Sequence, residues 1–355
     1  MDTVRFRAEP LQALGARILE AAGAPAETAR IVASALVEAN LRGHDSHGVL
    51  RIPQYIDRVH KGQIRPAVRP RIQAERGASA LVSGEWGFGQ PAGVAATDEA
   101  VRRAREYGAA AVGVVRCNHL GRVGAYVERA AAEDCAAMVW VGGLGHRPAV
   151  PHGGSRAALG TNPIAAGFPV EGEHPVVLDY ATTAIAVGKI MVARDAGTPL
   201  PPGIMLDRDG RPSTDPAEFF NEGALLPFGG HKGYALSVIA ELFGQALTGA
   251  DQHEGAGTAE AVFRRSGALV FAIYAGAFRP AAEAKAVARG LVTRLRAVPP
   301  APGVEGVLTP GEPEARTRRQ RASVGIEIAE RTWRAILTAA ESVGLASTDL
   351  PAPVV

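Results

Sequence analysis

The sequence predicts an α/β (α+β) protein with a helical N-terminal region, and three observations support this fold class. Helical patterns of apolar residues fill the chain before Ile64, whereas short apolar runs alternate with helical patterns from Ala80 onward. Strands separated by helices are typical of α/β layers. The chain also has 355 residues, more than the ~250–300 at which one core usually stops growing. We therefore expect two domains, a helical one at residues 1–75 with 314–355 and an α/β one at residues 76–313.

The helical domain is expected to contain helices whose apolar residues recur three and four positions apart. Two of them span residues 10–22 and 26–41. The next is expected to begin with Asp45 or Ser46 as its N-cap and to end at Gly62. A last helix at residues 329–342 is expected to return and pack on the N-terminal helices.

The α/β domain is expected to alternate strands with helices. The strands are predicted at residues 80–82, 110–115, 136–141, 176–178 and 268–274, and the helices at residues 91–106, 121–133, 183–196 and 281–297. A further long and well-packed helix begins near Gly230. The proline-rich residues 197–202 and the segment beyond them to Pro216 predict an irregular connection, either a surface excursion or a loop beside the substrate.

Composition narrows the class of protein. The formal charge is only +2, from 38 Lys+Arg against 36 Asp+Glu, and the basic residues form no tract, so no nucleic-acid partner is expected. The start of the chain has no apolar leader, and no uncharged apolar run approaches the ~18 residues that a membrane span needs. We expect a soluble cytoplasmic protein. Cys117 and Cys135 lack metal-ligand spacing, so we interpret them as small buried thiols and expect no metal site.

The segment at residues 42–64 carries the chemistry around which the site is predicted. His47, Arg51 and Tyr55 lie four residues apart, so on one helix they would form a polar stripe. Imidazole exchanges a proton near neutral pH, and guanidinium can hold a carboxylate by two parallel hydrogen bonds. The stripe thus suits a small anionic substrate. The alternative is a solvated surface helix, and Pro53 would kink or restart the helix in either case.

Two glycine-rich segments are candidates for a nucleotide site. Residues 87–93 read Gly-x-Gly-x-x-x-Gly, and Glu106 falls within the following helix pattern, not at the end of a second strand as ribose recognition in a Rossmann motif requires. We expect a glycine-rich strand-to-helix turn there. Residues 229–234 combine two glycines, Lys232 and the start of a long helix, which favours an anion such as pyrophosphate. The alternative is a glycine-rich cap with a solvated lysine.

Three polar loops lie between apolar segments, and polar residues at strand ends often build the sites of α/β proteins. They are Asn118-His119, residues 160–163, and Asp179 with Thr182 and Thr183. Each could also be an ordinary turn, in which Asp179 or Thr183 caps the next helix. Their number favours a site.

Together these segments resemble the type 2 malate/L-lactate dehydrogenase family, which is unrelated to the Rossmann-fold lactate dehydrogenases. The resemblance rests on Asp45-Ser46-His47-Gly48, Arg51-Ile52-Pro53, Asn118-His119 and residues 159–163, 178–183, 229–234 and 310–312, in the family's order. It implies a helical region, a non-Rossmann α/β dinucleotide-binding domain, NAD or NADP as cofactor, and a homodimer with cofactor sites near the dimer interface. It also implies reduction of 2-oxo acids or cyclic imines, or oxidation of 2-hydroxy acids.

The resemblance further implies roles for single residues. His47 would be the acid/base with His119 as second candidate, and Asp179 would orient whichever imidazole it reaches. Arg51 would hold the substrate carboxylate, with Tyr55 beside it. The implied cofactor contacts are Thr161, Asn162, Val177, Leu178, Asp179, Tyr180, Ala181, Thr182, Thr183, His231, Lys232, Gly311, Glu312 and Pro313.

The sequence departs from the family's pattern at Gly145-His146-Arg147-Pro148, where small polar residues usually precede the proline. Arg147 is therefore a second candidate substrate ligand, either for the carboxylate or for an acidic group at the far end of the substrate. Three alternatives stay open: a 2-hydroxyacid dehydrogenase, a reductase of a cyclic imine carboxylate, and a non-catalytic metabolite-binding homologue. The choice between NAD and NADP stays open too.

Overall fold

A mixed seven-stranded sheet forms the centre of the computed structural model, which describes residues 3–143, 148–253 and 263–346. Across the sheet the strands are ordered β2 (Arg71–Arg76), β3 (Ser79–Ser83), β4 (Ala109–Val115), β11 (Gly267–Tyr274), β5 (Cys135–Gly142), β6 (Ile164–Phe168) and β7 (Val176–Tyr180). Strands β3 and β4 run parallel, and the other described neighbours are antiparallel. The predicted α/β class is confirmed.

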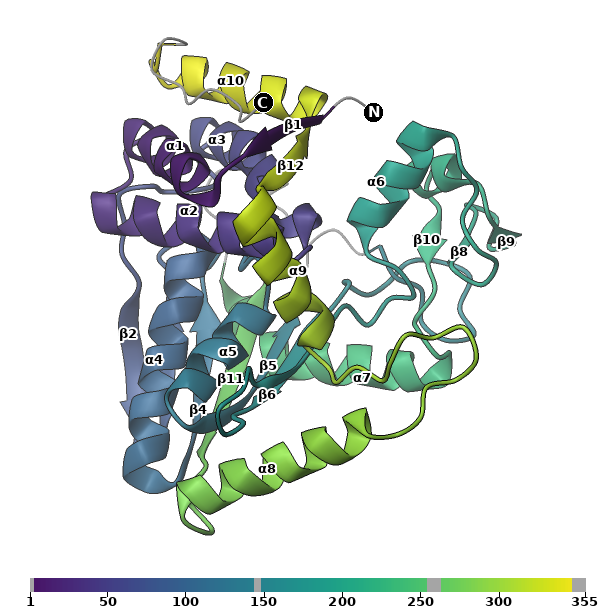
Figure 1. Ribbon diagram of the computed structural model, residues 1–355. Coiled ribbons are helices and arrows are strands. Elements are labelled where there is room, and N and C mark those ends of the chain that lie inside the picture. The colour runs from purple at the N-terminus through teal and green to yellow at the C-terminus, as the bar shows by residue number, and fades with distance from the viewer. Residues whose placement is uncertain (1–2, 144–147, 254–262, 347–355) are drawn as a thin grey trace.

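One face of this sheet is covered by α4 (Gly89–Tyr107) and α5 (Gly124–Ala132) (Figure 1). Alternate strand residues point to this face, among them Val112, Val139 and Val270. They meet a row of small side chains on α4, including Ala96 and Ala100, which are fully buried. A helix faced with alanine can lie close to a sheet, so the sequence produces a thin, tightly packed layer.

The opposite face of the sheet is apolar and open at one end. A groove of about 400 Å³ is lined there by Met138, Phe168, Leu178, Phe271, Ile273 and their neighbours. Helix α8 (Ala281–Arg296) buries only Val292 among its described residues and leaves Val287, Leu291 and Leu295 exposed. We call the lining residues and these three α8 side chains the open apolar face.

The helical region joins both ends of the described chain. Helices α1 (Ala8–Ala21), α2 (Ala26–Leu41), α3 (Ile52–His60) and α10 (Glu330–Ser342) share one core. Strand β1 (Thr3–Phe6) pairs antiparallel with β12 (Ile326–Ala329), and the rings of Phe6 and Trp333 lie 4.4 Å apart. The expected return of the last helix is thereby confirmed. The sheet begins at β2, before the predicted boundary at residues 75/76, and the domain limits stay a prediction.

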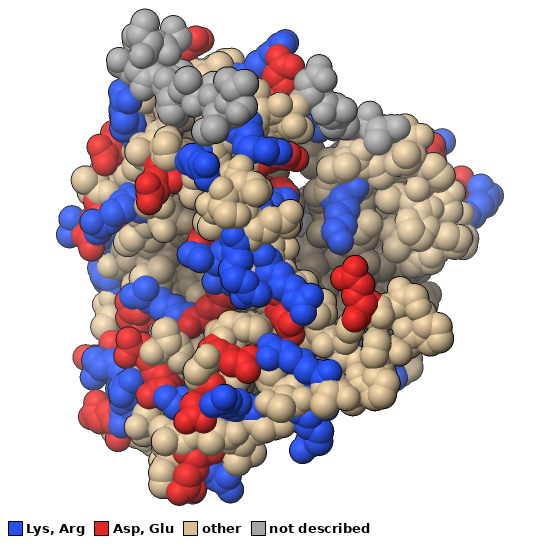
Figure 2. All heavy atoms as spheres, viewed as in Figure 1, with Lys and Arg blue, Asp and Glu red and all other residues tan. Residues whose placement is uncertain are grey.

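A small lobe is built from α6 (Val187–Ala196), β8 (Met205–Leu206), β9 (Pro212–Ser213) and β10 (Ala224–Leu225), with a 3₁₀ turn at Pro216–Phe220. Its own core contains Ile190, Leu200, Met205 and Leu225. Helix α9 (Glu312–Val324) faces it, and Figure 2 shows the surface hollowed between the two, with basic side chains gathered over α9. The segment predicted to be an irregular connection therefore contains short strands.

The long helix predicted to begin near Gly230 does begin there, but it is not well packed as predicted, since Ile239, Leu242 and Leu247 are exposed. Helix α7 (His231–Glu241) continues as one π-helical turn, Leu242–Ala246. A Cβ atom on Gly244 would lie 2.3 Å from the Gly142 nitrogen, so this turn presses onto the end of β5. No described helix has the length and apolarity needed to cross a membrane.

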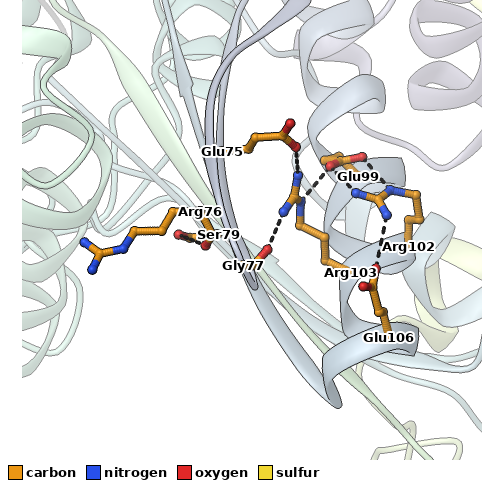
Figure 3. A network of polar contacts seen from close by, with 8 residues as sticks. All are labelled: Glu75, Arg76, Gly77, Ser79, Glu99, Arg102, Arg103 and Glu106. Carbon is orange, nitrogen blue, oxygen red and sulfur yellow. Dashed lines mark hydrogen bonds and ion pairs between the residues drawn. The ribbon is translucent and has the colours of Figure 1, made fainter.

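The edge strand β2 is fastened to α4 by charged side chains (Figure 3). The guanidinium of Arg103 contacts the Glu75 carboxylate and the Gly77 carbonyl oxygen, and its Nε donates to Glu99 at 2.6 Å. The Arg103 side chain is only 5% exposed. Arg102 shares Glu99 from the solvent side. These contacts hold the β2–β3 turn against the sheet layer.

Candidate active site

The segment that carries His47 is not one helix. It forms two 3₁₀ turns, Asp45–His47 and Val49–Arg51, before α3 starts at Ile52. Gly48 is extended between the turns, with φ −86° and ψ −157°. The predicted helix from Asp45 or Ser46 is therefore wrong, and neither side chain caps a helix. Pro53 instead lies in the first turn of α3, where proline is tolerated.

Asn40, a buried residue of α2, explains this local conformation. Its Nδ2 donates to Asp45 Oδ1 at 2.6 Å, and its Oδ1 accepts from the Val49 nitrogen at 2.9 Å. A Cβ atom on Gly48 would lie 2.2 Å from Asn40 Oδ1, so only glycine fits there. Asp45 also accepts two hydrogen bonds from Arg321 of α9. These tertiary contacts override the helical pattern of the segment.

His47 lies at the end of the first turn, with Arg51 close by. Its Nδ1 is 3.0 Å from Ser46 Oγ, and Arg51 Nε donates to the Ser46 carbonyl oxygen at 2.7 Å. Burial, followed by the charges of Arg51, His44 and Arg122, lowers the pKa of His47 to about 3. Without a bound anion, His47 is therefore a neutral imidazole at pH 7 and can accept a proton.

His119 faces His47 from the loop after β4. The two imidazole rings are nearly parallel, at 18°, with centroids 5.4 Å apart. Tyr55 Oη lies 2.8 Å from His119 Nδ1. Burial, followed by Arg51, lowers the pKa of His119 well below its ordinary value. The predicted members His47, Arg51, Tyr55 and His119 thus converge, although no single helix aligns them.

The glycine-rich segment at residues 87–93 positions His119. A Cβ atom on Gly89 would lie 2.3 Å from the carbonyl oxygens of both Asn118 and His119, so the start of α4 packs directly on this loop. The Asn118 amide donates to the carbonyl oxygens of Gln63, Trp86 and Gly87. Asn118 therefore holds backbone, and the segment is the strand-to-helix turn that the sequence predicted.

Asp179 has other partners than an imidazole. Its Oδ2 accepts from the Gly124 nitrogen at 2.8 Å and lies 3.9 Å from an Arg122 nitrogen. Burial raises the pKa of Asp179, while Arg122 opposes that effect. Among the described residues it forms no hydrogen bond with His47 or His119. Arg122 and His44 each act electrostatically on both Asp179 and His47, and their charges contribute to the low pKa of His47.

Three predicted cofactor segments meet along the end of β7. The nitrogen and the hydroxyl of Thr182 both donate to the Thr161 carbonyl oxygen at 3.0 Å, and the Phe228 nitrogen donates to the Thr182 carbonyl oxygen at 3.1 Å. The Asn162 amide donates to Glu241 of α7 at 2.7 Å. Residues 161–162, 179–183 and 228–241 thus form one wall.

The start of α7 suits a phosphate group. His231 and Lys232 are exposed there, directly after Gly229 and Gly230, whose φ angles are 57° and 62°. The Lys232 and Gly233 nitrogens already donate to the Gly229 and Phe228 carbonyl oxygens. The positive end of the helix dipole and the Lys232 ammonium are therefore what this segment offers to the diphosphate of a dinucleotide.

The Gly311–Pro313 segment lies at the other end of β7. The Val177 nitrogen donates to the Pro310 carbonyl oxygen at 3.1 Å, and a Cβ atom on Gly311 would lie 3.1 Å from Val177 Cβ. Burial opposes ionisation of Glu312, but the Thr309 N–H, Arg316 and Arg296 lower its pKa to about 2. Glu312 therefore anchors the start of α9, and its contact with a cofactor stays a prediction.

Several residues of the site were missed by the sequence reasoning, or lie where it cannot be checked. Gln90 donates to Tyr55 at 2.8 Å, and Arg122 and Asn40 act as described above. Sequence spacing links none of them to His47. Gln90 and Arg122 lie far along the chain, and Asn40, although close in sequence, acts on this loop from a different element, α2. Arg147 lies outside the described residues, so its predicted role stays a prediction.

The chain is similar to known proteins over nearly its whole length. Residues 6–337 match the family model described as malate/L-lactate dehydrogenase. The L-lactate dehydrogenase of Cupriavidus necator is 38% identical over 338 residues, covering 93% of this chain and 95% of that protein. The Δ1-pyrroline-2-carboxylate/Δ1-piperideine-2-carboxylate reductase of Pseudomonas putida is 34% identical over 334 residues, covering 92% and 94%.

A solved structure agrees with these matches. The sulfolactate dehydrogenase from Methanocaldococcus jannaschii superposes with a TM-score of 0.88 at 34% identity, and the match covers 98% of this chain and 99% of that one. The protein is therefore an enzyme of the dehydrogenase class that acts on CH–OH groups. More narrowly, the chain belongs to the malate/L-lactate dehydrogenase family.

Proposed function

We propose that the protein is an NAD(P)-dependent oxidoreductase that interconverts a small 2-hydroxy acid and the corresponding 2-oxo acid. The observation that carries this proposal is the pair of facing imidazoles, His47 and His119, beside the Arg51 guanidinium. Lactate and sulfolactate, named for two relatives, each carry a carboxylate next to the reacting carbon. Arg51 is placed to hold such a carboxylate while the carbon next to it faces the imidazoles.

His47 is proposed to move the proton. In the oxidation of a hydroxy acid, neutral His47 accepts the hydroxyl proton as the hydride leaves the carbon. In reduction, His47 must first become imidazolium, and it then protonates the developing alkoxide. A carboxylate bound at Arg51 offsets one of the charges that depress the pKa of His47, so substrate binding favours proton uptake. Such positioned proton transfer contributes roughly 10²–10⁴-fold in rate.

NAD or NADP is proposed to lie along β7. When bound, the nicotinamide supplies a hydride acceptor or donor. The wall formed by residues 161–162 and 179–183 would line the cofactor, and Val177 with residues 311–313 would contact its other end. Lys232 and the α7 N-terminus would bind the diphosphate.

A homodimer is proposed to cover the open apolar face. The apolar groove of about 400 Å³ and the exposed Val287, Leu291 and Leu295 of α8 are apolar surfaces of the kind that protein interfaces cover. Light scattering should therefore give twice the chain mass of 36.8 kDa.

The test of the function is turnover of NADH and NADPH, followed by absorbance with a panel of 2-oxo acids and cyclic imine carboxylates. Consumption with a 2-oxo acid supports the proposal. Preference for an imine would favour the second candidate, suggested by the similarity to the cyclic-imine reductase of Pseudomonas putida. Cofactor fluorescence changes without any consumption would indicate a metabolite-binding homologue. Parallel titrations would also decide between NAD and NADP.

A further inference from the structure

His119 has a fixed hydrogen-bond partner on one side of its ring only. Tyr55 Oη lies 2.8 Å from its Nδ1, and Gln90 Nε2 donates to the same Tyr55 oxygen at 2.8 Å. Tyr55 and Gln90 are each 1% exposed, so both hydrogen bonds are made inside the protein. Within the described parts of the chain, no residue bonds Nε2 of His119.

The order of donors along this chain determines where His119 carries its proton. In its present amide orientation Gln90 directs Nε2 at Tyr55; this nitrogen can only donate, so it occupies one lone pair of the Tyr55 oxygen, and Gln90 Oε1 is left buried without a partner among the described residues. Nδ1 of His119 is then the acceptor left for the Tyr55 proton among the described residues. If Nδ1 carried a proton instead, the buried Tyr55 hydroxyl would have no acceptor, which is strongly disfavoured in a dry site.

We propose that Tyr55 and Gln90 are positioning residues that hold His119 as a neutral imidazole with its proton on Nε2. This Nε2–H is then a fixed donor to the reacting oxygen of the substrate, and His119 keeps its proton throughout the reaction. The inference rests on the proposed function for the identity of that oxygen. The position of the proton does not depend on it.

The hydrogen-bond partner of His47, unlike that of His119, can either donate or accept. Nδ1 of His47 faces Ser46 Oγ at 3.0 Å, and a serine hydroxyl can rotate to donate or to accept. Ser46 therefore serves both the imidazole and the imidazolium form of His47. If Nδ1 of His119 were protonated, the Tyr55 hydroxyl would have no acceptor for its proton. His47 therefore exchanges the proton, whereas His119 stabilises negative charge on the reacting oxygen of the substrate.

The ring geometry and the proton balance agree with this division. The ring centroids are 5.4 Å apart, so one small substrate can contact both imidazoles. During oxidation the hydroxyl proton passes to His47, the hydride leaves carbon for the cofactor, and the C=O bond forms. The Nε2–H of His119 remains in place at the beginning and at the end.

Nitrogen NMR of the histidine side chains tests the proposal without substrate. In ¹⁵N-histidine-labelled protein, the signals that are missing from His119→Gln belong to His119. We expect an unprotonated Nδ1 and a protonated Nε2, unchanged between pH 5 and 9. A protonated Nδ1, or a ring that titrates in this range, would overturn the proposal, since either means that Tyr55 does not donate.

Steady-state kinetics test whether the position of the His119 proton affects catalysis. Removing a donor to a developing oxyanion costs about 10²–10³ in kcat, and a misplaced proton should cost part of that. Tyr55→Phe and Gln90→Leu should each lower kcat at least about tenfold, with substrate and cofactor KM within about threefold, and should give a mixed His119 tautomer.

Tyr126→Phe is the matched control for these variants. It also removes a buried tyrosine hydroxyl, which donates to the Leu120 carbonyl oxygen and to no imidazole. Its kcat should stay within about twofold of wild type. Equal kcat in Tyr55→Phe and Tyr126→Phe would contradict the positioning role. A wild type that turns over no hydroxy acid yet shows the expected tautomer would instead contradict the proposed function alone.

Discussion

Ser46 and Gly188 touch where the small lobe meets the loop of His47. A Cβ atom added to Gly188 would lie 2.6 Å from Ser46 Cβ, closer than real Cβ atoms approach. Ser46 in turn lies 3.0 Å from His47 Nδ1. The first turn of α6 therefore supports the residue that orients the imidazole, and the position of the small lobe is coupled to His47.

This contact predicts that Gly188→Ala lowers activity without unfolding the protein. The added methyl must displace Ser46, and a small misplacement of a catalytic group can cost up to about 10²-fold. We expect kcat to fall about tenfold or more while the melting temperature changes little. Gly306→Ala is the control, since nothing lies within 4 Å of a Cβ atom there. If Gly188→Ala keeps the wild-type kcat, the loop of Ser46 and His47 can shift without harm to catalysis, which would contradict this prediction.

Stability should fall in acid because His47 is buried as a neutral ring. Its pKa is about 3 in the folded protein against an ordinary 6.5, so between these values the unfolded chain binds a proton that the folded chain does not. The free energy of unfolding then rises with pH across this window, by up to about 1.4 kcal/mol per pH unit for one histidine.

Urea unfolding at pH 7.5, 6 and 5 measures this dependence. His47→Gln should show a shallower slope than wild type, because the variant has lost the group that takes up the proton. His60→Gln, which alters an exposed histidine of α3, should keep the wild-type slope. Equal slopes in wild type and His47→Gln would contradict the buried neutral ring.

Lys232 should act on cofactor affinity and not on the chemical step. Lys232→Ala is expected to raise the cofactor KM and to leave the saturated rate nearly unchanged, as loss of uniform binding does. Lys61→Ala is the control, because that lysine pairs with Asp57 on the surface of α3. An unchanged cofactor KM with a collapsed rate would show that the α7 N-terminus does not bind the diphosphate.

The contacts of Arg102 and Arg103 that hold β2 against α4 predict that loss of each arginine affects stability differently. Arg103→Ala removes a buried guanidinium and takes its donor from Glu75 and from the Gly77 carbonyl oxygen, at a cost of about 1–3 kcal/mol in the free energy of unfolding. Arg102→Ala, which alters a largely exposed partner of the same Glu99, should change stability little. Urea denaturation followed by circular dichroism compares them. Equal losses would mean that burial does not set the strength of this cluster.

The sequence predicted the α/β class and most long elements because hydrophobic periodicity is local. It failed where a contact between separate elements decides the conformation. Asn40 breaks the helix expected at His47, and the Gly142–Gly244 contact accompanies the π turn after α7. The short strands β8–β10 bury too few residues to produce a hydrophobic periodicity that would predict a strand from the sequence.

For the site, spacing predicted that side chains converge, but for a partly wrong reason. His47, Arg51 and Tyr55 do converge, but a 3₁₀ turn followed by the extended Gly48 brings them together. His119 joins them from another segment. Asp179 was expected near an imidazole and instead binds Gly124 and Arg122. Gln90 left no signal, because its meaning depends on Tyr55 lying beside it in space.

Arg51 predicts that substrates need a carboxylate next to the reacting carbon. Its Nε is used by the Ser46 carbonyl oxygen and one terminal nitrogen by Gln54, which leaves further N–H groups for a substrate. Losing a charge-assisted hydrogen bond costs about 1.5–3 kcal/mol, so a neutral amide analogue should lose at least about tenfold in kcat/KM. Arg51→Lys should also be impaired, because an ammonium cannot reproduce the planar fork.

The roles of Arg51 and Arg147 can be separated with two substrates. Pyruvate carries one carboxylate and oxaloacetate two, so Arg51→Ala should reduce kcat/KM for both. If Arg147 binds the distal carboxylate, Arg147→Ala should reduce kcat/KM for oxaloacetate alone. Unchanged kcat/KM for both substrates in Arg51→Ala would mean that Arg51 only supports the loop through Ser46, and the carboxylate would then have to bind elsewhere.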